Sequence, residues 1–231
     1  MTESRTAPQP HSHHLRVQRT ARYFTLGGES GAPKTIWFVL HGYGQLAEQF
    51  VRYFAELADA DTLIVAPEAM NRFYLVSVDK APARERPVGA TWMTREDRES
   101  EIADYVEYLD ALHDDIAQKN GSESPASVNV VGFSQGAATA TRWVTHGRAR
   151  IDRLILWGGL LAPDVELDHG RALRGVSLTL VVGNRDHYVT GEMVNAEKAR
   201  LAGLGISYQF VEFDGGHVIR RSVFPQIKAP A

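Results

Sequence analysis

Short apolar runs alternate along the chain with segments in which apolar residues recur every three or four positions. Apolar runs rich in β-branched residues predict strands that are buried on both faces. Five such runs are expected to form parallel strands, at residues 35–40, 62–66, 127–133, 153–157 and 177–182. Residues 206–213 alternate more and are expected nearer an edge, and residues 16–26 are expected to add one or two antiparallel strands.

Helical spacing appears between these runs. Leu46, Phe50, Phe54 and Leu57 recur at that spacing, and residues 102–116 carry one apolar stripe. The longer helix is expected to end at Asn120-Gly121, and two further helices are expected at residues 136–144 and 191–204. This alternation predicts an α/β fold, with a mainly parallel sheet flanked by helices on both faces.

The domain organisation is expected to be simple. Residues 1–14 are polar and contain proline, which predicts a flexible tail, and residues 15–231 are expected to form one domain. Residues 11–14 include three histidines, but a terminal polar tract rarely has the fixed geometry of a metal site, so no metal or cofactor is expected. Residues 68–93 are a long stretch of unclear structure, and long loops in compact domains are often functional.

Composition narrows the class of protein. The chain has 231 residues, 44% of them hydrophobic, which is enough for one sizeable core. A formal net charge of −3 argues against a nucleic-acid partner. The arginines between Arg142 and Arg153 form a local exception, and we interpret them as a solvated surface.

Absent features complete this picture. The sequence contains no cysteine, which excludes disulfides, thiolate metal sites and a cysteine nucleophile. It shows neither a secretory apolar run near residue 1 nor the roughly 18 consecutive apolar residues of a membrane helix. A cytoplasmic location is therefore expected, whereas the oligomeric state cannot be inferred.

The sharpest chemical signal is the pentapeptide Gly132-Phe133-Ser134-Gln135-Gly136. It follows an apolar strand directly and precedes an alanine-rich helical segment, which is the strand–turn–helix that a nucleophile elbow requires. Small residues at both ends of the pentapeptide allow the sharp turn that exposes a serine hydroxyl. The alternative is an ordinary serine in a glycine-rich turn.

A catalytic serine needs a base to accept its proton. His217 follows the last predicted strand through Gly215 and Gly216, and of the nine histidines only His187 is a serious rival. Asp186 comes directly after the strand at residues 177–182 and is the candidate acid that orients the base. The order Ser134, Asp186, His217 is that of the α/β-hydrolase fold, and all three follow the carboxyl ends of strands.

An oxyanion hole should complete such a site. One donor is expected to be the backbone N–H of Gln135, directly after the candidate nucleophile. The other is assigned to the backbone N–H of Tyr43, in the segment His41-Gly42-Tyr43-Gly44 that follows an early strand. The alternative is that this segment only makes a turn, and His41 itself is expected to be structural.

Together these motifs resemble the phospholipase/carboxylesterase family, a branch of small α/β-hydrolases that includes acyl-protein thioesterases and bacterial carboxylesterases. The resemblance covers residues 34–224 and is most specific in the pentapeptide around Ser134. It implies hydrolysis of small-molecule carboxylic esters or thioesters through an acyl-enzyme, without a cofactor. The length of the chain leaves little room for a large lid domain. The chain departs from the family's pattern at Gln45-Leu46-Ala47, where an aspartate or similar polar residue is usual.

Substrate selection is assigned to residues 68–93, whose apolar side chains are placed to cover a cleft. The candidates for substrate binding are Phe73, Tyr74, Leu75 and Trp92, and the alternative is that they pack a helix against the sheet. Other functions of the same triad stay open, namely a lactonase, a peptidase or an acyltransferase, because the fold does not fix the leaving group. A non-catalytic ligand receptor is the alternative from another class, although such proteins usually lose a triad member.

Overall fold

A computed structural model of the chain describes residues 9–77, 80, 82–120, 126–167 and 173–228. Its strands are β1 (Tyr23–Gly27), β2 (Thr35–Leu40), β3 (Thr62–Pro67), β4 (Asn71–Tyr74), β5 (Val88–Thr91), β6 (Ser127–Phe133), β7 (Arg153–Trp157), β8 (Ser177–Gly183) and β9 (Tyr208–Phe213). Its α-helices are α1 (Ala47–Phe50), α2 (Arg98–Asn120), α3 (Gln135–His146), α4 (Gly191–Gly203) and α5 (Phe224–Lys228). Short 3₁₀ helices are η1 (Val51–Leu57), η2 (Ala83–Glu85) and η4 (Arg221–Val223).

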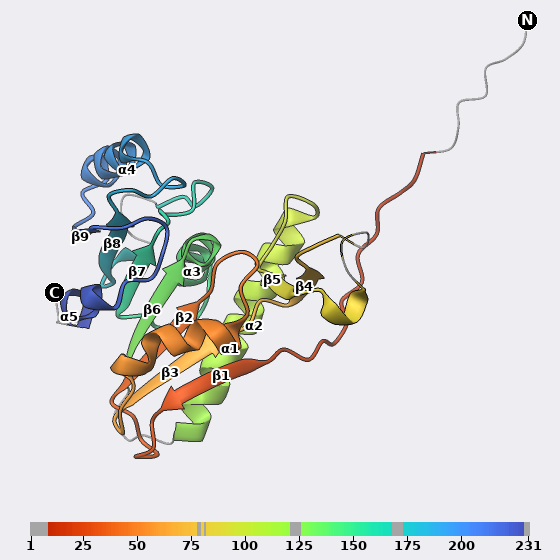
Figure 1. Cartoon of the computed structure of the whole chain (residues 1–231), viewed down its shortest axis with the longest axis horizontal. Helices are drawn as coiled ribbons and strands as arrows, with labels where there is room; N and C mark the ends of the chain where they lie inside the picture. Colours follow the sequence, from red (N-terminus) through yellow and green to blue (C-terminus); the bar gives the residue numbers. More distant parts are fainter. Residues whose placement is uncertain (1–8, 78–79, 81, 121–125, 168–172, 229–231) are drawn as a thin grey trace, which may run out of the picture.

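The main sheet confirms the predicted fold. In the described residues its seven strands lie in the order β1-β3-β2-β6-β7-β8-β9, and all neighbouring pairs are parallel except β1 with β3 (Figure 1). The five predicted parallel strands are present, β9 lies at an edge as expected, and the amino-terminal region contributes one antiparallel strand. Because the carboxyl ends of parallel strands share one edge, the loops after β2, β6, β8 and β9 meet there.

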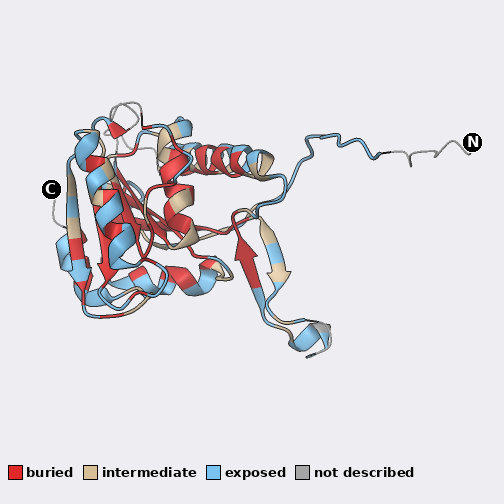
Figure 2. Cartoon of the chain, turned by 90° about the horizontal axis from the view of Figure 1, so that it is seen from above, coloured by how far each residue is buried: buried red, intermediate tan, exposed pale blue. Residues whose placement is uncertain are grey.

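Two apolar cores lie on the two faces of this sheet. Successive side chains of β2 alternate between them: Phe38 belongs to the core under α2 and α3, and Trp37 and Val39 belong to the core under α1, η1 and α5. Figure 2 shows the buried sheet between helices that present exposed outer faces. The central strands are therefore buried on both faces, as their continuous apolar runs predicted, whereas the edge strands β1 and β9 are partly exposed.

Two predicted segments differ in detail from the structure. The helix expected from Leu46 to Leu57 is a short α1 followed by the 3₁₀ helix η1. Residues 68–93 contain an antiparallel hairpin of β4 and β5, with Phe73 opposite Gly89, rather than one irregular loop. The hairpin projects from the body of the molecule, and its buried base contrasts with its exposed far end (Figure 2).

Two predictions fall partly outside the described residues, namely the helix end at Asn120-Gly121 and the tail at residues 1–14. Gly121 and residues 1–8 are not described. Residues 9–14 have no regular secondary structure, and His14 Nε2 lies 3.0 Å from Asp97 Oδ1.

Among the helices within the described ranges, none has both the length and the apolar character that crossing a bilayer requires.

The expectation for the arginines was wrong at Arg142 and only partly right at Arg153, which is half-buried. Arg148 and Arg150 are exposed, but only 5% of Arg142 is accessible to solvent. The Arg142 guanidinium is buried because it makes two hydrogen bonds to the Asp164 carboxylate, at 3.1 and 2.7 Å. A buried charge of this kind is tolerated because its partner compensates the lost hydration.

One buried carboxylate links the amino-terminal segment, the hairpin and the first helix. The Glu68 side chain is fully buried and accepts hydrogen bonds from Arg22 Nε at 2.7 Å and from Arg72 Nε at 2.6 Å. It also accepts one from the Ala47 N–H, at the start of α1. Burial alone would raise the pKa of this carboxyl, but the hydrogen bonds from the two arginines outweigh burial and hold the pKa below its usual value.

Replacing Glu68 by glutamine should therefore lower the free energy of unfolding by about 1–3 kcal/mol at neutral pH. Because the pKa is lower in the folded state, the charged form stabilises the fold above the unfolded pKa of about 4.3, and this contribution is lost as pH falls through the folded pKa. Urea unfolding from neutral to acidic pH should show a shallower acid loss for Glu68→Gln than for the wild type.

Glu107→Gln is the matched control, since Glu107 pairs with Arg16 at 2.7 Å but both side chains are largely exposed. An exposed pair of this kind should contribute less than about 1 kcal/mol. Equal losses in the two variants at neutral pH would contradict the role assigned to Glu68.

Candidate active site

Ser134 stands at the turn between β6 and α3, in an unusual backbone conformation. Its φ is 54° and its ψ is −117°, values that a residue with a side chain rarely adopts. The turn brings backbone segments very close together on both sides of Ser134, and glycines at positions 132 and 136 make this approach possible. A Cβ on Gly132 would lie 2.2 Å from the Gly136 carbonyl oxygen, and a Cβ on Gly136 would lie 2.3 Å from the Leu40 carbonyl oxygen.

Asp186 and His217 are joined directly. The His217 Nδ1 and the Asp186 Oδ2 lie 2.7 Å apart, and the Asp186 side chain is almost fully buried. The other carboxylate oxygen, Oδ1, accepts the N–H groups of Tyr188 and Val189, at 2.8 and 3.0 Å. The carboxylate is thus fixed by three contacts, and His187, the rival histidine, is exposed.

The loops that carry the acid and the candidate base are linked through their backbones. The Arg185 N–H donates to the Gly215 carbonyl at 2.8 Å, and the Gly215 N–H donates to Asn184 Oδ1 at 3.2 Å. A Cβ on Gly183 would lie 2.4 Å from the Gly215 carbonyl oxygen. This close approach explains why glycines occur on both loops.

Trp157, at the end of β7, links Ser134 to the loop of His217. Its carbonyl accepts the Ser134 N–H at 2.9 Å, which continues the pairing of β6 with β7. Its indole Nε1 donates to the Val218 carbonyl at 3.0 Å, one residue beyond the histidine. The imidazole also lies 4.9 Å from the ring of Phe133, between ring centroids, so Ser134 and His217 belong to one cluster.

The loop after β2 reaches the same cluster. A Cβ on Gly42 would lie 3.2 Å from the Ser134 Cβ. The Gly42 N–H donates to Gln45 Oε1 at 2.8 Å, so Gln45 stabilises this turn. Among the described residues, none accepts a hydrogen bond from the N–H of Tyr43 or of Gln135, the two predicted oxyanion donors.

His41 is buried and has only structural contacts. Its Nδ1 donates to the Gly42 carbonyl at 2.8 Å, and its Nε2 accepts the Ala69 N–H at 3.1 Å. This pattern requires a neutral imidazole, and burial lowers the pKa of His41, which favours the same form. The geometry agrees with the structural role expected for this histidine.

The end of β5 connects the two segments that carry the predicted donors. The Gln135 side chain accepts the Trp92 N–H at 3.1 Å and donates to the Met93 carbonyl at 2.8 Å. On the other side, the Trp92 indole Nε1 donates to the His41 carbonyl at 2.8 Å. The loop after β2 and the start of α3 are thus held at fixed positions relative to each other.

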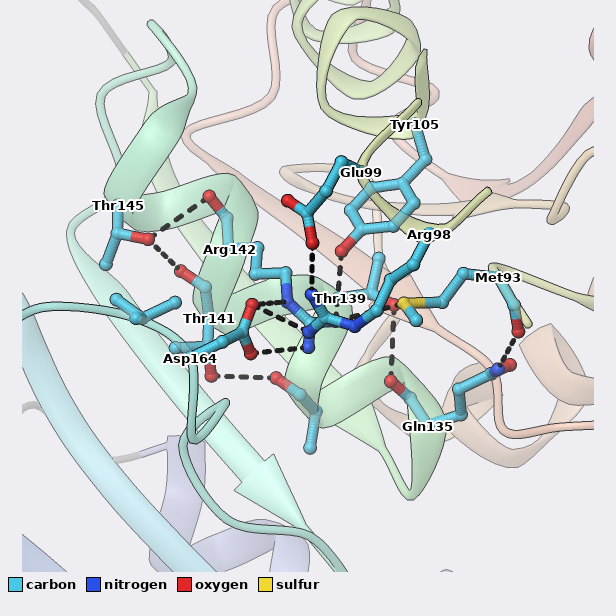
Figure 3. A network of polar contacts seen from close by, with 12 residues as sticks. Met93, Arg98, Glu99, Tyr105, Gln135, Thr139, Thr141, Arg142, Thr145 and Asp164 are labelled. Atoms are coloured by element: carbon cyan, nitrogen blue, oxygen red, sulfur yellow. Dashed lines mark hydrogen bonds and ion pairs between the residues drawn. The ribbon is translucent and has the colours of Figure 1, made fainter. Parts of the chain in front are cut away.

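A polar network extends this connection to α2 (Figure 3). Arg142 lies between Asp164, the Tyr105 hydroxyl at 3.1 Å and the Met93 sulfur at 3.4 Å. Arg98 adds an ion pair with Asp164 at 2.8 Å. The hydrogen bond from Arg142, with further help from Arg98, holds the pKa of the Asp164 carboxyl well below its usual range, so the network stays charged.

The four predicted substrate residues occupy different environments. Phe73 is half-buried, with its ring centroid 5.1 Å from that of Tyr43. Leu75 is exposed, and a Cβ on Gly44 would lie 3.2 Å from its Cδ2. Tyr74 is exposed beside the Arg86 guanidinium, at 4.1 Å. Trp92 is only 2% exposed and packs against His41, so its role in substrate binding stays a prediction.

A mainly parallel sheet with a serine elbow, an acid after β8 and a histidine after β9 defines the α/β-hydrolase class. Residues 26–229 match the sequence model of the phospholipase/carboxylesterase family, and the chain belongs to this family. No curated protein matches the chain in a sequence comparison.

Solved structures agree with this fold. A carboxylesterase from Mesorhizobium loti is 18% identical, with a TM-score of 0.66, over 91% of this chain and 95% of that chain. Acyl-protein thioesterase 2 of Zea mays is 17% identical, with a TM-score of 0.65, over 90% of this chain and 96% of that chain. The esterase PE8 is 23% identical, with a TM-score of 0.62, over 90% and 96% of the two chains.

Some residues around the cluster had no signal in the sequence. Trp157 ends a buried strand, where a tryptophan is expected to be a core residue. Its hydrogen-bond partner, the Val218 carbonyl, is 61 positions away in the sequence. Tyr188 lies two positions after Asp186, and its ring centroid is 4.7 Å from that of His217. Only the position of Tyr188 beside the predicted acid could have drawn attention to it.

Proposed function

We propose that this protein is a serine hydrolase that cleaves carboxylic esters or thioesters of small to medium acyl groups. The observation that carries the proposal is the Asp186–His217 hydrogen bond of 2.7 Å, at the sheet edge where Ser134 is held in its left-handed turn. The carboxylate fixes Nδ1 as the donor, which leaves Nε2 of the imidazole free to accept a proton.

Acylation is the first half of the proposed reaction. His217 Nε2 takes the proton of the Ser134 hydroxyl while Oγ attacks the carbonyl carbon of the substrate. The carbonyl oxygen becomes an oxyanion, and the backbone N–H groups of Tyr43 and Gln135 donate to it. The absence of a described acceptor for these two groups supports this assignment, because unpaired donors are available without rearrangement.

The tetrahedral intermediate then collapses. The bond from the carbonyl carbon to the leaving oxygen or sulfur breaks, and the imidazolium returns its proton to the leaving group. Water attacks the resulting acyl ester of Ser134 by the same sequence, with His217 again as the base. Every step uses side chains and backbone groups of this chain, so the scheme requires no cofactor.

The acyl chain is assigned to the side of the cluster that the hairpin borders. Phe73 and Leu75 lie next to Tyr43 and Gly44, directly beyond the loop that carries one candidate donor. The exposed Leu75 and the half-buried Phe73 could contact an acyl chain there, whereas the buried Trp92 would only support the residues in front of it. The names of the similar structures, an acyl-protein thioesterase and carboxylesterases, agree with this substrate class.

Hydrolysis of p-nitrophenyl esters from acetate to laurate, and of matching thioesters, tests the proposal directly. Wild-type protein should release acid, and Ser134→Ala should lose at least ~10³-fold in kcat, because the nucleophile is removed. A fluorophosphonate should add its mass to the wild type at Ser134 and leave the variant unmodified.

Ser127→Ala is the control, since Ser127 is exposed at the opposite end of the same strand. It should keep wild-type rates. The proposal would be refuted if Ser134→Ala kept its activity. It would also be refuted if the wild type neither hydrolysed any ester nor reacted with the fluorophosphonate. An added amine that captures most of the acyl group in place of water would indicate an acyltransferase instead.

A second prediction concerns the position of the base. Trp157→Phe keeps an aromatic ring but removes the indole N–H that holds the Val218 carbonyl, so the loop of His217 should become less well placed. The expected result is a fall in kcat of ~10-fold with little change in KM, because misplacement affects the transition state more than ground-state binding. Steady-state kinetics on one ester and the rate of fluorophosphonate labelling check it.

Trp143→Phe is a closely matched control for this variant. Trp143 is equally buried and its Nε1 donates to Asp110 Oδ1 at 2.9 Å, between α3 and α2. The two variants should lose similar stability in thermal unfolding, but only Trp157→Phe should lose kcat. Equal kcat values in the two variants would show that Trp157 supports the core alone.

A further inference from the structure

Tyr188 presents an exposed aromatic ring beside the candidate base. The ring is 73% exposed, and its centroid lies 4.7 Å from that of the His217 imidazole. A tyrosine joins a large apolar ring to a polar hydroxyl, which makes it a frequent contact residue at binding surfaces. The position is therefore a candidate contact for a ligand.

The backbone under this ring is rigid. The Tyr188 N–H donates to Asp186 Oδ1 at 2.8 Å, and the next residue, Val189, is buried against Val182 and Val194. The Tyr188 backbone is consequently held beside the carboxylate, and the ring lies against the imidazole. A preorganised aromatic contact loses little conformational entropy when a ligand binds it.

The chemistry of acyl transfer indicates which part of a substrate comes here. Asp186 occupies Nδ1 of His217, so Nε2 must return the proton to the departing oxygen or sulfur. The leaving group therefore departs next to the imidazole. Of the two rings in contact with that imidazole, Phe133 is buried and Tyr188 is exposed, and Val218, the residue after the histidine, is also exposed.

The acyl side of the cluster is formed by other residues. Tyr43, Phe73 and Leu75 belong to the loop after β2 and to the hairpin, whereas Tyr188 and Val218 follow β8 and β9. Because β2 and β9 are separated in the sheet by β6, β7 and β8, the two apolar groups lie on different sides of Ser134. Changes to the leaving-group side can thus be made without touching the acyl side.

We propose that Tyr188, together with Val218, forms a leaving-group subsite that selects esters with an aromatic or bulky apolar alcohol part. The proposal rests on the serine-hydrolase function and adds a substrate class to it. An aromatic alcohol part would pack against the Tyr188 ring during acylation, when the proton of His217 is transferred to its oxygen.

Acetate esters of benzyl alcohol and of ethanol provide the test, because both give the same acetyl-enzyme and differ only in acylation. The quantity compared is the ratio of kcat/KM for benzyl acetate to kcat/KM for ethyl acetate. It should favour benzyl acetate in the wild type and fall about 3- to 10-fold in Tyr188→Ala, the range expected for loss of an aromatic contact. Tyr188→Phe should keep the wild-type ratio.

Tyr53→Ala is the matched control, since Tyr53 is an exposed tyrosine on η1 whose ring lies against Phe50. It should leave the ratio unchanged. If Tyr188→Ala lowers both rates equally, Tyr188 only supports His217 and the subsite is refuted. A ratio near one in the wild type, or a Tyr188→Phe variant that behaves like Tyr188→Ala, also refutes the apolar subsite. If the wild type hydrolyses neither ester, that result counts against the serine-hydrolase function itself.

Discussion

The left-handed backbone at Ser134 is the constraint around which the rest of the candidate site is arranged. A conformation of this kind costs about 1–3 kcal/mol and persists only where the surrounding structure enforces it. Here the enforcement comes from the main sheet, since the Ser134 N–H bonds to β7 and the chain on either side lies within contact distance of backbone atoms. Gly132 and Gly136 are required because a side chain at either position would overlap those atoms.

The same sheet edge determines how the other groups approach the serine. The loop after β2 is held by a hydrogen bond within it, from Gly42 to Gln45, and by one from the Trp92 indole. Gln135 also bonds to Trp92, directly after β5. The hairpin that borders the acyl side is therefore continuous with the groups that position both candidate donors. A substrate that displaced the hairpin would also disturb the two candidate donors, which favours binding that leaves β5 in place.

Local patterns predicted most of the fold, and they also gave three candidate triad residues, whose catalytic roles stay predictions. Buried strands need apolar runs, and a turn as tight as that at Ser134 needs glycines, so both leave marks in the sequence. The hairpin at residues 71–91 was missed because β4 alternates exposed and half-buried positions over only four residues. The burial of Arg142 was missed for a different reason: its partner, Asp164, lies 22 positions away, and spacing alone cannot pair them.

Rigidity and selectivity are assigned to different residues of this chain. The groups that fix geometry, such as Asp186, Gln135 and Trp157, are bonded to backbone atoms of neighbouring strands and loops. The residues that border the cluster without such bonds from their side chains are apolar and exposed, namely Tyr188 and Leu75. Because an exposed side chain contributes little to core packing, its replacement changes what the cluster contacts while the triad geometry is kept. If the cluster binds substrate as proposed, a single substitution at these exposed positions should alter substrate preference at little cost in stability.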